Sequence, residues 1–227
     1  MTEPTINFSR FYERACKRKG GEKAMLARMP RIASLSELKQ LDDRDVLSTI
    51  TRCIFRAGFV WRIIEAKWPG FEEAFKNFVP LYWQQVPPEV LEELSKDQRI
   101  VRNPQKINTV PANARMIVEV SEQYSSFGQF LGQWPSAQQA ELLHYIKKNG
   151  SRLGGITPQY VLRELGWDGF ILSSDVVTAL TNHNLMDASP TSQKGLKQAQ
   201  AAFNHWHQKT RLPYSHLSRI LSYSVGD

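Results

Sequence analysis

The sequence lacks the features that direct a chain into or across a membrane, and it contains little cysteine. No stretch approaches the roughly 20 consecutive apolar residues of a membrane-spanning helix, and the first residues lack the apolar run and cleavage site of a signal peptide. The two cysteines, Cys16 and Cys53, could form at most one disulfide. A single pair in a chain of 227 residues is typical of reduced thiols. We therefore expect a cytoplasmic protein without a membrane partner.

Long alternations of apolar and polar residues, which indicate β-strands, are also absent, as are repeats and low-complexity segments. Apolar residues instead recur every three or four positions after Asp45, at Leu47, Ile50, Ile54, Ala57, Trp61 and Ile64. This spacing predicts a helix over residues 45–66, ended by Trp68-Pro69-Gly70 because proline and glycine do not continue a helix. The predicted fold class is all-α.

Similar patterns predict the remaining elements. Helices are expected over residues 71–78, after Pro87-Pro88, over 105–124 with Lys106 and Arg115 exposed, over 127–134, 137–149 and 158–165, and from Ser173 onward. The polar residues 189–200 are expected to form a loop or linker. With 41% apolar residues, the chain can bury the core of one domain or of two small lobes.

Positive charge is in excess and is concentrated in three segments. The formal net charge is +7. Residues 1–33 contain eight Lys or Arg against three acidic residues, residues 98–115 four against none, and residues 188–226 five against none. Such clusters suit a polyphosphate backbone, which makes a nucleic acid a candidate partner. Many soluble proteins reach this charge without binding one, so charge alone leaves both interpretations open.

Residues 160–186 are expected to form a helix, a short glycine-containing hairpin and a second helix. In DNA-binding hairpins of this kind, backbone N–H groups and the N-terminus of the second helix bind a phosphate without reading sequence. Gly166 and Gly169 would permit the close approach. Without further context, an ordinary helical hairpin is the favoured interpretation, because two glycines at this spacing are a weak pattern.

Three blocks of sequence, in order and at matching spacing, supply that context. The first is Ala57-Gly58-Phe59-Val60-Trp61, followed by Phe71-Glu72-Glu73-Ala74-Phe75. The second runs from Arg99 to Ile107 and is followed by Asn113-Ala114-Arg115. The third is Phe170-Ile171-Leu172-Ser173-Ser174, with Leu185-Met186-Asp187 after it. Together they resemble the DNA-3-methyladenine glycosylase I family of the helix-hairpin-helix DNA glycosylase superfamily.

This resemblance implies a helix-hairpin-helix DNA glycosylase-like helical domain over residues 41–227, with its hairpin at about 158–186 and a basic N-terminal extension over residues 1–40 packing on it. It also implies a base-excision-repair glycosylase that hydrolyses the N-glycosidic bond of an alkylated, 3-methyladenine-like purine. We expect a monomer without a cofactor that binds double-stranded DNA containing alkylated bases and, in a prokaryote, associates with the nucleoid. The alternative is a catalytically weak or inactive DNA-binding relative.

The resemblance assigns the base pocket to Trp61 and Cys53. An enzyme acting on a base in a duplex turns the base out of the stack, and an indole can stack on it and attract a cationic purine. Without the neighbouring Ala57-Gly58, Trp61 would be interpreted as a core residue. Cys53 stands where the family has the glutamate that contacts the base, and a thiol does not replace that carboxylate.

Other candidate residues follow from the same resemblance. Asp187 is the candidate catalytic carboxylate, with a helix-capping or loop carboxylate as the equal alternative. Arg102, Lys106, Ser173 and Ser174 are candidate phosphate contacts, and solvated surface is the alternative for the two basic residues. Relatives with lyase activity carry a lysine on the helix after the hairpin, and none occurs from Ser173 to Leu180.

We expect no metal site. The family's Cys and His zinc ligands are missing at both ends of the chain, and Cys16 and Cys53 have no partner cysteine at metal-binding spacing. His205 and His207 form a pair without a third ligand nearby in the sequence. We interpret them as surface histidines near a phosphate backbone rather than as metal ligands.

Overall fold

The computed structural model describes residues 7–225, which form helices and no strand. The helices are α1 Ser9–Arg18, α2 Glu22–Leu26, α3 Leu35–Lys39, α4 Asp43–Arg56, α5 Trp61–Ala74, α6 Pro80–Trp83, α7 Pro88–Leu94, α8 Pro104–Ile107, α9 Val110–Tyr124, α10 Phe127–Leu131, α11 Gln139–Asn149, α12 Thr157–Glu164, α13 Ser174–Asn182, α14 Gln193–Thr210 and α15 Tyr214–Ser224. Two short 3-10 helices are Lys76–Phe78 and Ser136–Gln138. The predicted all-α class is confirmed. Within 7–225, no helix has the length and apolar character needed to cross a membrane.

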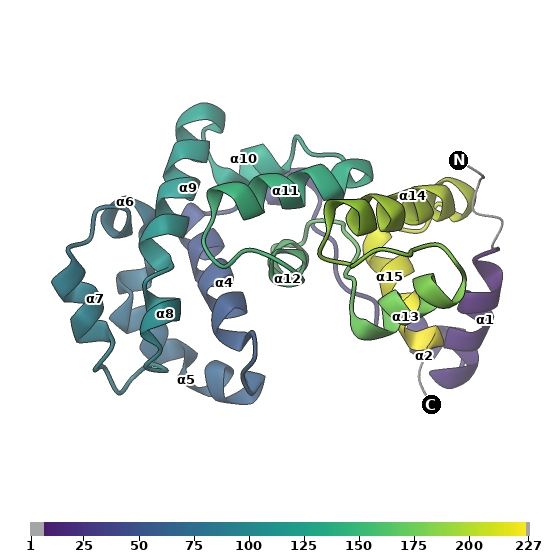
Figure 1. The fold of residues 1–227 in the computed structure, drawn as a ribbon, viewed down its shortest axis with the longest axis horizontal. Coiled ribbons are helices and arrows are strands. Elements are labelled where there is room, and N and C mark those ends of the chain that lie inside the picture. The colour runs from purple at the N-terminus through teal and green to yellow at the C-terminus, as the bar shows by residue number, and fades with distance from the viewer. Residues whose placement is uncertain (1–6, 226–227) are drawn as a thin grey trace.

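The helices pack around two hydrophobic clusters. The first cluster contains buried side chains from α3 to α12, and the second contains those of α1, α2 and residues 170–221. The two ends of the described chain share the second cluster, where α1 packs on α15 (Figure 1). Helix α12 lies in the middle of the molecule, between these two groups of helices (Figure 1). Packing of α11 on α14 and hydrogen bonds from Arg163 of α12 to Gly169 and Ser218 join the two groups.

The basic N-terminal region contributes to both clusters. Phe11 of α1 and Met25 of α2 are buried in the second cluster, whereas Leu38 of α3 is buried in the first. The expected division into an extension over residues 1–40 and a domain over residues 41–227 stays a prediction. Residues 1–6 of that extension lie outside the described part of the chain.

The prediction of a single helix over residues 45–66 is wrong, because the segment forms two helices. The break between them creates the candidate functional site. Helix α4 ends at Arg56, and α5 begins at Trp61. Between them Gly58 has a φ of 68°, a left-handed conformation that favours glycine. The apolar spacing did not reveal the break because an interruption of about four residues nearly preserves the 3.6-residue helical period.

Two further helix boundaries differ from the prediction because of proline. Pro69 does not end α5, because Trp68 and Phe71 on either side of it are buried and stack on each other with ring centroids 4.8 Å apart. Their packing carries the helix past the missing backbone hydrogen bond. Conversely, the expected helix over residues 105–124 is divided into α8 and α9. Pro111 cannot donate to the carbonyl of Ile107 and instead occupies the first turn of α9.

The polar segment 189–200 is also partly helical rather than a loop. The side chain of Ser192 caps α14 by accepting a hydrogen bond from the backbone N–H of Gly195 at 3.0 Å. Gly195 packs closely on the carbonyl of Ser189, and Ala199 is fully buried. The polar composition of the segment reflects one exposed face of a helix whose other face belongs to the second cluster.

Helices α12 and α13 form the expected hairpin. Two buried glutamines hold the segment that connects them. Gln139 exchanges two hydrogen bonds of 2.8 Å with the backbone N–H and C=O of Phe170, and the side-chain oxygen of Gln159 accepts from the N–H of Leu172 at 2.6 Å. These bonds satisfy backbone groups that no helix pairs, and they fix the segment between α12 and α13 against α11 and α12.

We expect Gln139→Leu to destabilise the fold by about 2–3 kcal/mol, because it leaves a buried N–H and C=O of Phe170 without partners. Urea unfolding followed by circular dichroism measures the change. Gln138→Leu is the matched control: the neighbouring glutamine is exposed, and its replacement should cost about 0.5 kcal/mol or less. Equal losses in the two variants would show that the hairpin does not depend on this clamp.

Candidate base-binding pocket

The break between α4 and α5 opens a cavity of about 680 Å³. Its walls come from the C-terminal end of α4, the turn that follows, the first turn of α5, and one face of α12. The lining residues are Cys53, Arg56, Ala57, Gly58, Phe59, Val60, Trp61, Ile63, Ile156, Thr157, Tyr160 and Glu164. The structure thus brings together both predicted pocket residues, Trp61 and Cys53, with residues that lie about a hundred positions later in the sequence.

An aromatic corner forms one side of the cavity. The Trp61 side chain begins α5 and is 47% exposed, so it is not a core residue. Its indole meets the ring of Tyr160 edge to face, with centroids 5.5 Å apart. Phe59, on the turn, is 43% exposed and also lines the cavity. Exposed aromatic faces in a concave site are suited to stacking on a planar ring.

Three charged side chains lie beside this corner. The Arg56 guanidinium is 12% exposed and forms ion pairs with Glu65 of α5, at 2.5 Å, and with Glu164 of α12. It also lies 5.2 Å from the centre of the Trp61 ring. Burial opposes the charge on Arg56, but hydrogen bonding to Glu65 and the charge of Glu164 outweigh it and raise the arginine pKa. One cation between two carboxylates gives the group a net charge of −1.

Cys53 lies at the buried side of the cavity, with 5% of its surface exposed. Burial raises the pKa of the Cys53 thiol, and the adjacent Glu164 carboxylate raises that pKa further. The thiol therefore stays protonated at neutral pH and is not a nucleophilic thiolate. Position 53 carries no carboxylate, but the cavity still contains one, because Glu164 lies next to Cys53.

Lys106 is not exposed as expected, since only 8% of its surface is accessible. Its ammonium donates hydrogen bonds to the carbonyl oxygens of Phe55, at 3.0 Å, and of Ala57, at 2.7 Å. Burial and the charge of Arg152 lower the pKa of Lys106. The side chain thus caps the C-terminal end of α4 and holds the turn that opens the cavity.

The other residues proposed for DNA contact occupy different environments. Arg102 is exposed on the loop before α8. The Ser173 side chain caps α13 by accepting a hydrogen bond from the N–H of Val176 at 3.4 Å, and Ser174 is exposed in the first turn. None of these three residues lines the cavity, and their contact with DNA stays a prediction.

Gly166 and Gly169 permit close approaches within the chain itself. A Cβ on Gly166, whose φ is 84°, would lie 2.7 Å from that of Ala33. A Cβ on Gly169 would lie 2.7 Å from the Trp167 ring, and the Gly169 carbonyl accepts a hydrogen bond from Arg163. Packing therefore accounts for both glycines, whatever their role toward DNA.

Asp187 lies in the loop between α13 and α14 and is not among the residues that line the cavity. Its carboxylate accepts a hydrogen bond from Gln198 at 2.7 Å and pairs with Lys194 at 3.0 Å. Hydrogen bonds from Gln198 and Lys194 lower the pKa of Asp187, so this exposed carboxylate is ionised at neutral pH. Its assignment as the catalytic carboxylate stays a prediction.

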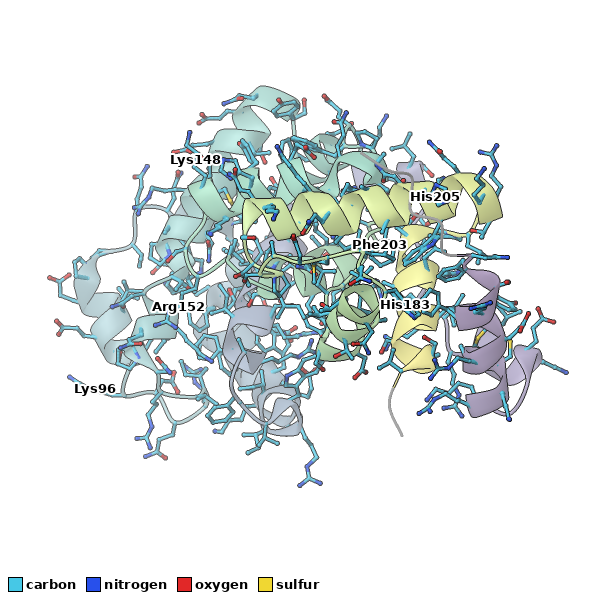
Figure 2. All side chains as sticks on the ribbon, turned by 45° about the vertical axis from the view of Figure 1, so that its right-hand side comes forward. Lys96, Lys148, Arg152, His183, Phe203 and His205 are labelled. Carbon is cyan, nitrogen blue, oxygen red and sulfur yellow. The ribbon has the colours of Figure 1, made fainter. Side chains whose placement is uncertain are left out.

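Within the described part of the chain, no group of three or more His, Cys, Asp or Glu side chains could hold a metal ion. Figure 2 shows His183 and His205 on the side of the molecule formed by α1, α14 and α15. His207 uses its Nδ1 in a 2.8 Å hydrogen bond with the carbonyl of Leu212, and its ring stacks on Tyr214. That contact gives His207 a structural role.

Three important residues of the cavity were missed by the sequence analysis: Arg56, Tyr160 and Glu164. Arg56 directly precedes the Ala57-Gly58 block and could have been included with it. Tyr160 and Glu164 are four residues apart, so they share one face of α12. Nothing in the sequence shows that this face packs on α4, because that contact joins residues more than a hundred positions apart.

Solved structures with the same fold show what class of protein this architecture defines. A 3-methyladenine DNA glycosylase I is 21% identical, with a TM-score of 0.50 over 62% of this chain and 84% of that one. The 3-methyladenine DNA glycosylase I of Staphylococcus aureus is also 21% identical, with a TM-score of 0.49 over 58% and 84%. The 8-oxoguanine glycosylase/lyase of Methanocaldococcus jannaschii is 15% identical, with a TM-score of 0.55 over 93% and 95%. The two matches with a TM-score of 0.50 or more show that the chain has the fold of the helical DNA glycosylases.

The sequence itself identifies the family. The profile of the methyladenine glycosylase family matches residues 37–153, and the chain belongs to this family. None of the curated proteins compared with the chain matches it. The predicted family and helix-hairpin-helix glycosylase fold are confirmed, and with them the class, DNA glycosylase. The matched residues end before α12, so they do not include Tyr160 and Glu164.

We expect Arg56→Gln to lower the free energy of unfolding by about 2 kcal/mol, because it removes a guanidinium that is only 12% exposed and leaves the carboxylates of Glu65 and Glu164 without their shared partner. Arg99→Gln is the matched control. Arg99 also pairs with two carboxylates, Asp97 and Glu73, but is 53% exposed, so its loss should cost about 1 kcal/mol or less. Urea unfolding of both variants makes the comparison, and an Arg56→Gln cost no larger than that of Arg99→Gln would contradict it.

Proposed function

We propose that the protein is a monofunctional DNA glycosylase that removes an alkylated purine from double-stranded DNA by hydrolysis. The observation that carries this proposal is the cavity between α4, α5 and α12, in which an exposed indole lies beside a group with a net negative charge. Its aromatic side suits a flipped base, and its charge suits a base that alkylation has made cationic. A neutral purine would gain only the stacking.

The position of α12 connects this pocket with DNA binding. One face of α12 supplies Tyr160 and Glu164 to the cavity, and the same helix leads into the hairpin and α13. A phosphate held at the first turn of α13 by Ser173 and Ser174 would place the DNA backbone beside the hairpin. The exposed Arg102 is a second proposed phosphate contact. We leave Lys106 out of this set because its ammonium already has two carbonyl acceptors.

Hydrolysis requires little acid catalysis from this site, since a cationic purine is a good leaving group. The bond between the purine nitrogen and the sugar C1′ breaks, its electron pair leaves with the purine, and a water oxygen bonds to C1′ and releases a proton. A carboxylate near the sugar would stabilise the oxocarbenium-like transition state. We propose Asp187 for this role because it lies shortly after α13, the second helix of the hairpin. The described α13 contains no lysine, which favours hydrolysis over Schiff-base lyase chemistry.

The direct test is to incubate the protein with methylated duplex DNA and to measure released bases and alkali-labile sites under single-turnover conditions. We expect release of methylated purines, and a loss of about tenfold or more in Trp61→Ala, because the variant removes the stacking surface. Tyr82→Ala is the control, since Tyr82 is an aromatic residue that is 37% exposed outside the cavity.

Two results would contradict this proposal in different ways. Unchanged base release by Trp61→Ala would show that the cavity is not the base pocket. Binding of methylated duplex without release of any base would establish the alternative, a DNA-binding relative without glycosylase activity. The feature that favours this alternative is Cys53, which stands where the family has a carboxylate.

The proposed DNA contact of Arg102 predicts a change in salt dependence. Arg102→Gln should weaken duplex binding uniformly across sequences and lower the slope of log affinity against log salt concentration by about 1. Lys148→Gln, which removes the same charge from the exposed upper side of the molecule in Figure 2, should leave the slope unchanged. Fluorescence anisotropy at several salt concentrations measures both slopes, and equal slopes in the two variants would exclude Arg102 as a phosphate contact.

A further inference from the structure

The structure assigns a role to Glu164 that neither the family match nor the sequence blocks give it. We propose that Glu164 is the carboxylate that recognises a cationic base in the pocket. It would take the role of the glutamate that Cys53 replaces. This inference rests on the proposed function and adds the residue that selects the substrate by charge.

Geometry supports the assignment first. Glu164 is the last residue of α12, and its side chain is 28% exposed, so it is accessible from the cavity that it lines. It stands four residues after Tyr160 on the same helix face, next to the aromatic corner formed by Tyr160 and Trp61. A base stacked in this corner would therefore have its edge near the carboxylate. Glu164 and its ion-pair partner Arg56 are the charged residues among those that line the cavity.

The balance of charge supports the assignment second. Arg56 lies 5.2 Å from the centre of the Trp61 ring and would by itself repel a cationic base. Glu65 neutralises that charge but does not line the cavity. Glu164 is then the side chain that makes the sum negative on the cavity side. If a neutral residue replaced Glu164, the ion pair of Arg56 and Glu65 would remain, and its net charge is zero.

The environment of Cys53 supports the assignment third. The thiol is buried next to Glu164, and both burial and that carboxylate raise the pKa of Cys53. A protonated thiol has no charge to repel the carboxylate and is small enough to leave space for it. A glutamate at position 53 would bring two carboxylates together here. Cys53 and Glu164 can therefore lie side by side without the electrostatic repulsion that two carboxylates would have.

The test compares Glu164→Gln with Glu65→Gln. Each variant removes one carboxylate partner of Arg56, but Glu164 faces the cavity and Glu65 does not. We expect Glu164→Gln to slow the release of 3-methyladenine from methylated duplex by about tenfold or more, the loss expected when a charged hydrogen-bond acceptor becomes neutral. Glu65→Gln should lose less than about threefold, because Glu65 does not line the cavity and its carboxylate would not contact the base. Urea unfolding midpoints establish that both variants fold.

A double variant tests the proposed exchange of positions. Cys53→Glu in the Glu164→Gln background restores a single carboxylate to the pocket, on α4 instead of α12, and should recover at least part of the lost rate. Cys53→Glu alone places two carboxylates together and should not exceed the native rate. Recovery in the double variant would distinguish a recognition role of Glu164 from a structural one, which a carboxylate on another helix would not replace.

The outcomes separate this inference from the proposed function. Native-like release by Glu164→Gln, or equal losses in Glu164→Gln and Glu65→Gln, would overturn the role of Glu164 while the glycosylase stands. If the native protein releases no base, quenching of tryptophan fluorescence by free 3-methyladenine decides the question. Quenching that Glu164→Gln abolishes would support the inference although the enzymatic proposal fails. No quenching in the native protein would overturn both.

Discussion

The termination of α4 at Arg56 is the constraint on which the site depends. If α4 continued into α5, as the apolar spacing predicts, Trp61 would belong to a continuous helix and the cavity would not exist. The Lys106 ammonium holds the break by donating to the carbonyl oxygens of Phe55 and Ala57. Gly58 adopts the left-handed conformation that the turn requires. A lysine expected on the DNA-binding surface therefore acts inside the protein, on the shape of the pocket.

Electrostatics then decides what the pocket can bind. Arg56 connects α4 with α5 through Glu65 and with α12 through Glu164, so the ion pairs that stabilise the walls also set the charge of the cavity. An aromatic corner with a net negative group is suited to a flat cation and disfavours an anion. Arg56, Glu65 and Glu164 thus contribute both to the stability of the site and to its charge.

The two hydrophobic clusters explain how the pocket is positioned relative to the hairpin. Helix α12 lies between them, with Tyr160 and Glu164 directed to the cavity and its C-terminal end leading into the hairpin. Gln139 and Gln159 fix the hairpin through buried hydrogen bonds. A glycosylase must hold the DNA backbone while it turns out a base. In the proposed function, α12 joins the pocket to the hairpin that would hold the backbone.

The sequence by itself determined the helical class and the family, because helical periodicity and short blocks are local properties of the chain. The resemblance to that family also indicated Trp61 and Cys53, and both line the cavity. Local patterns did not predict three features that tertiary packing decides. These are the break after Arg56, the continuation of α5 through Pro69, and the burial of Lys106. Local patterns also did not reveal Glu164, because its place beside Cys53 results from the packing of α12 on α4. A charge can be read from sequence, but what it faces is decided only by long-range contacts.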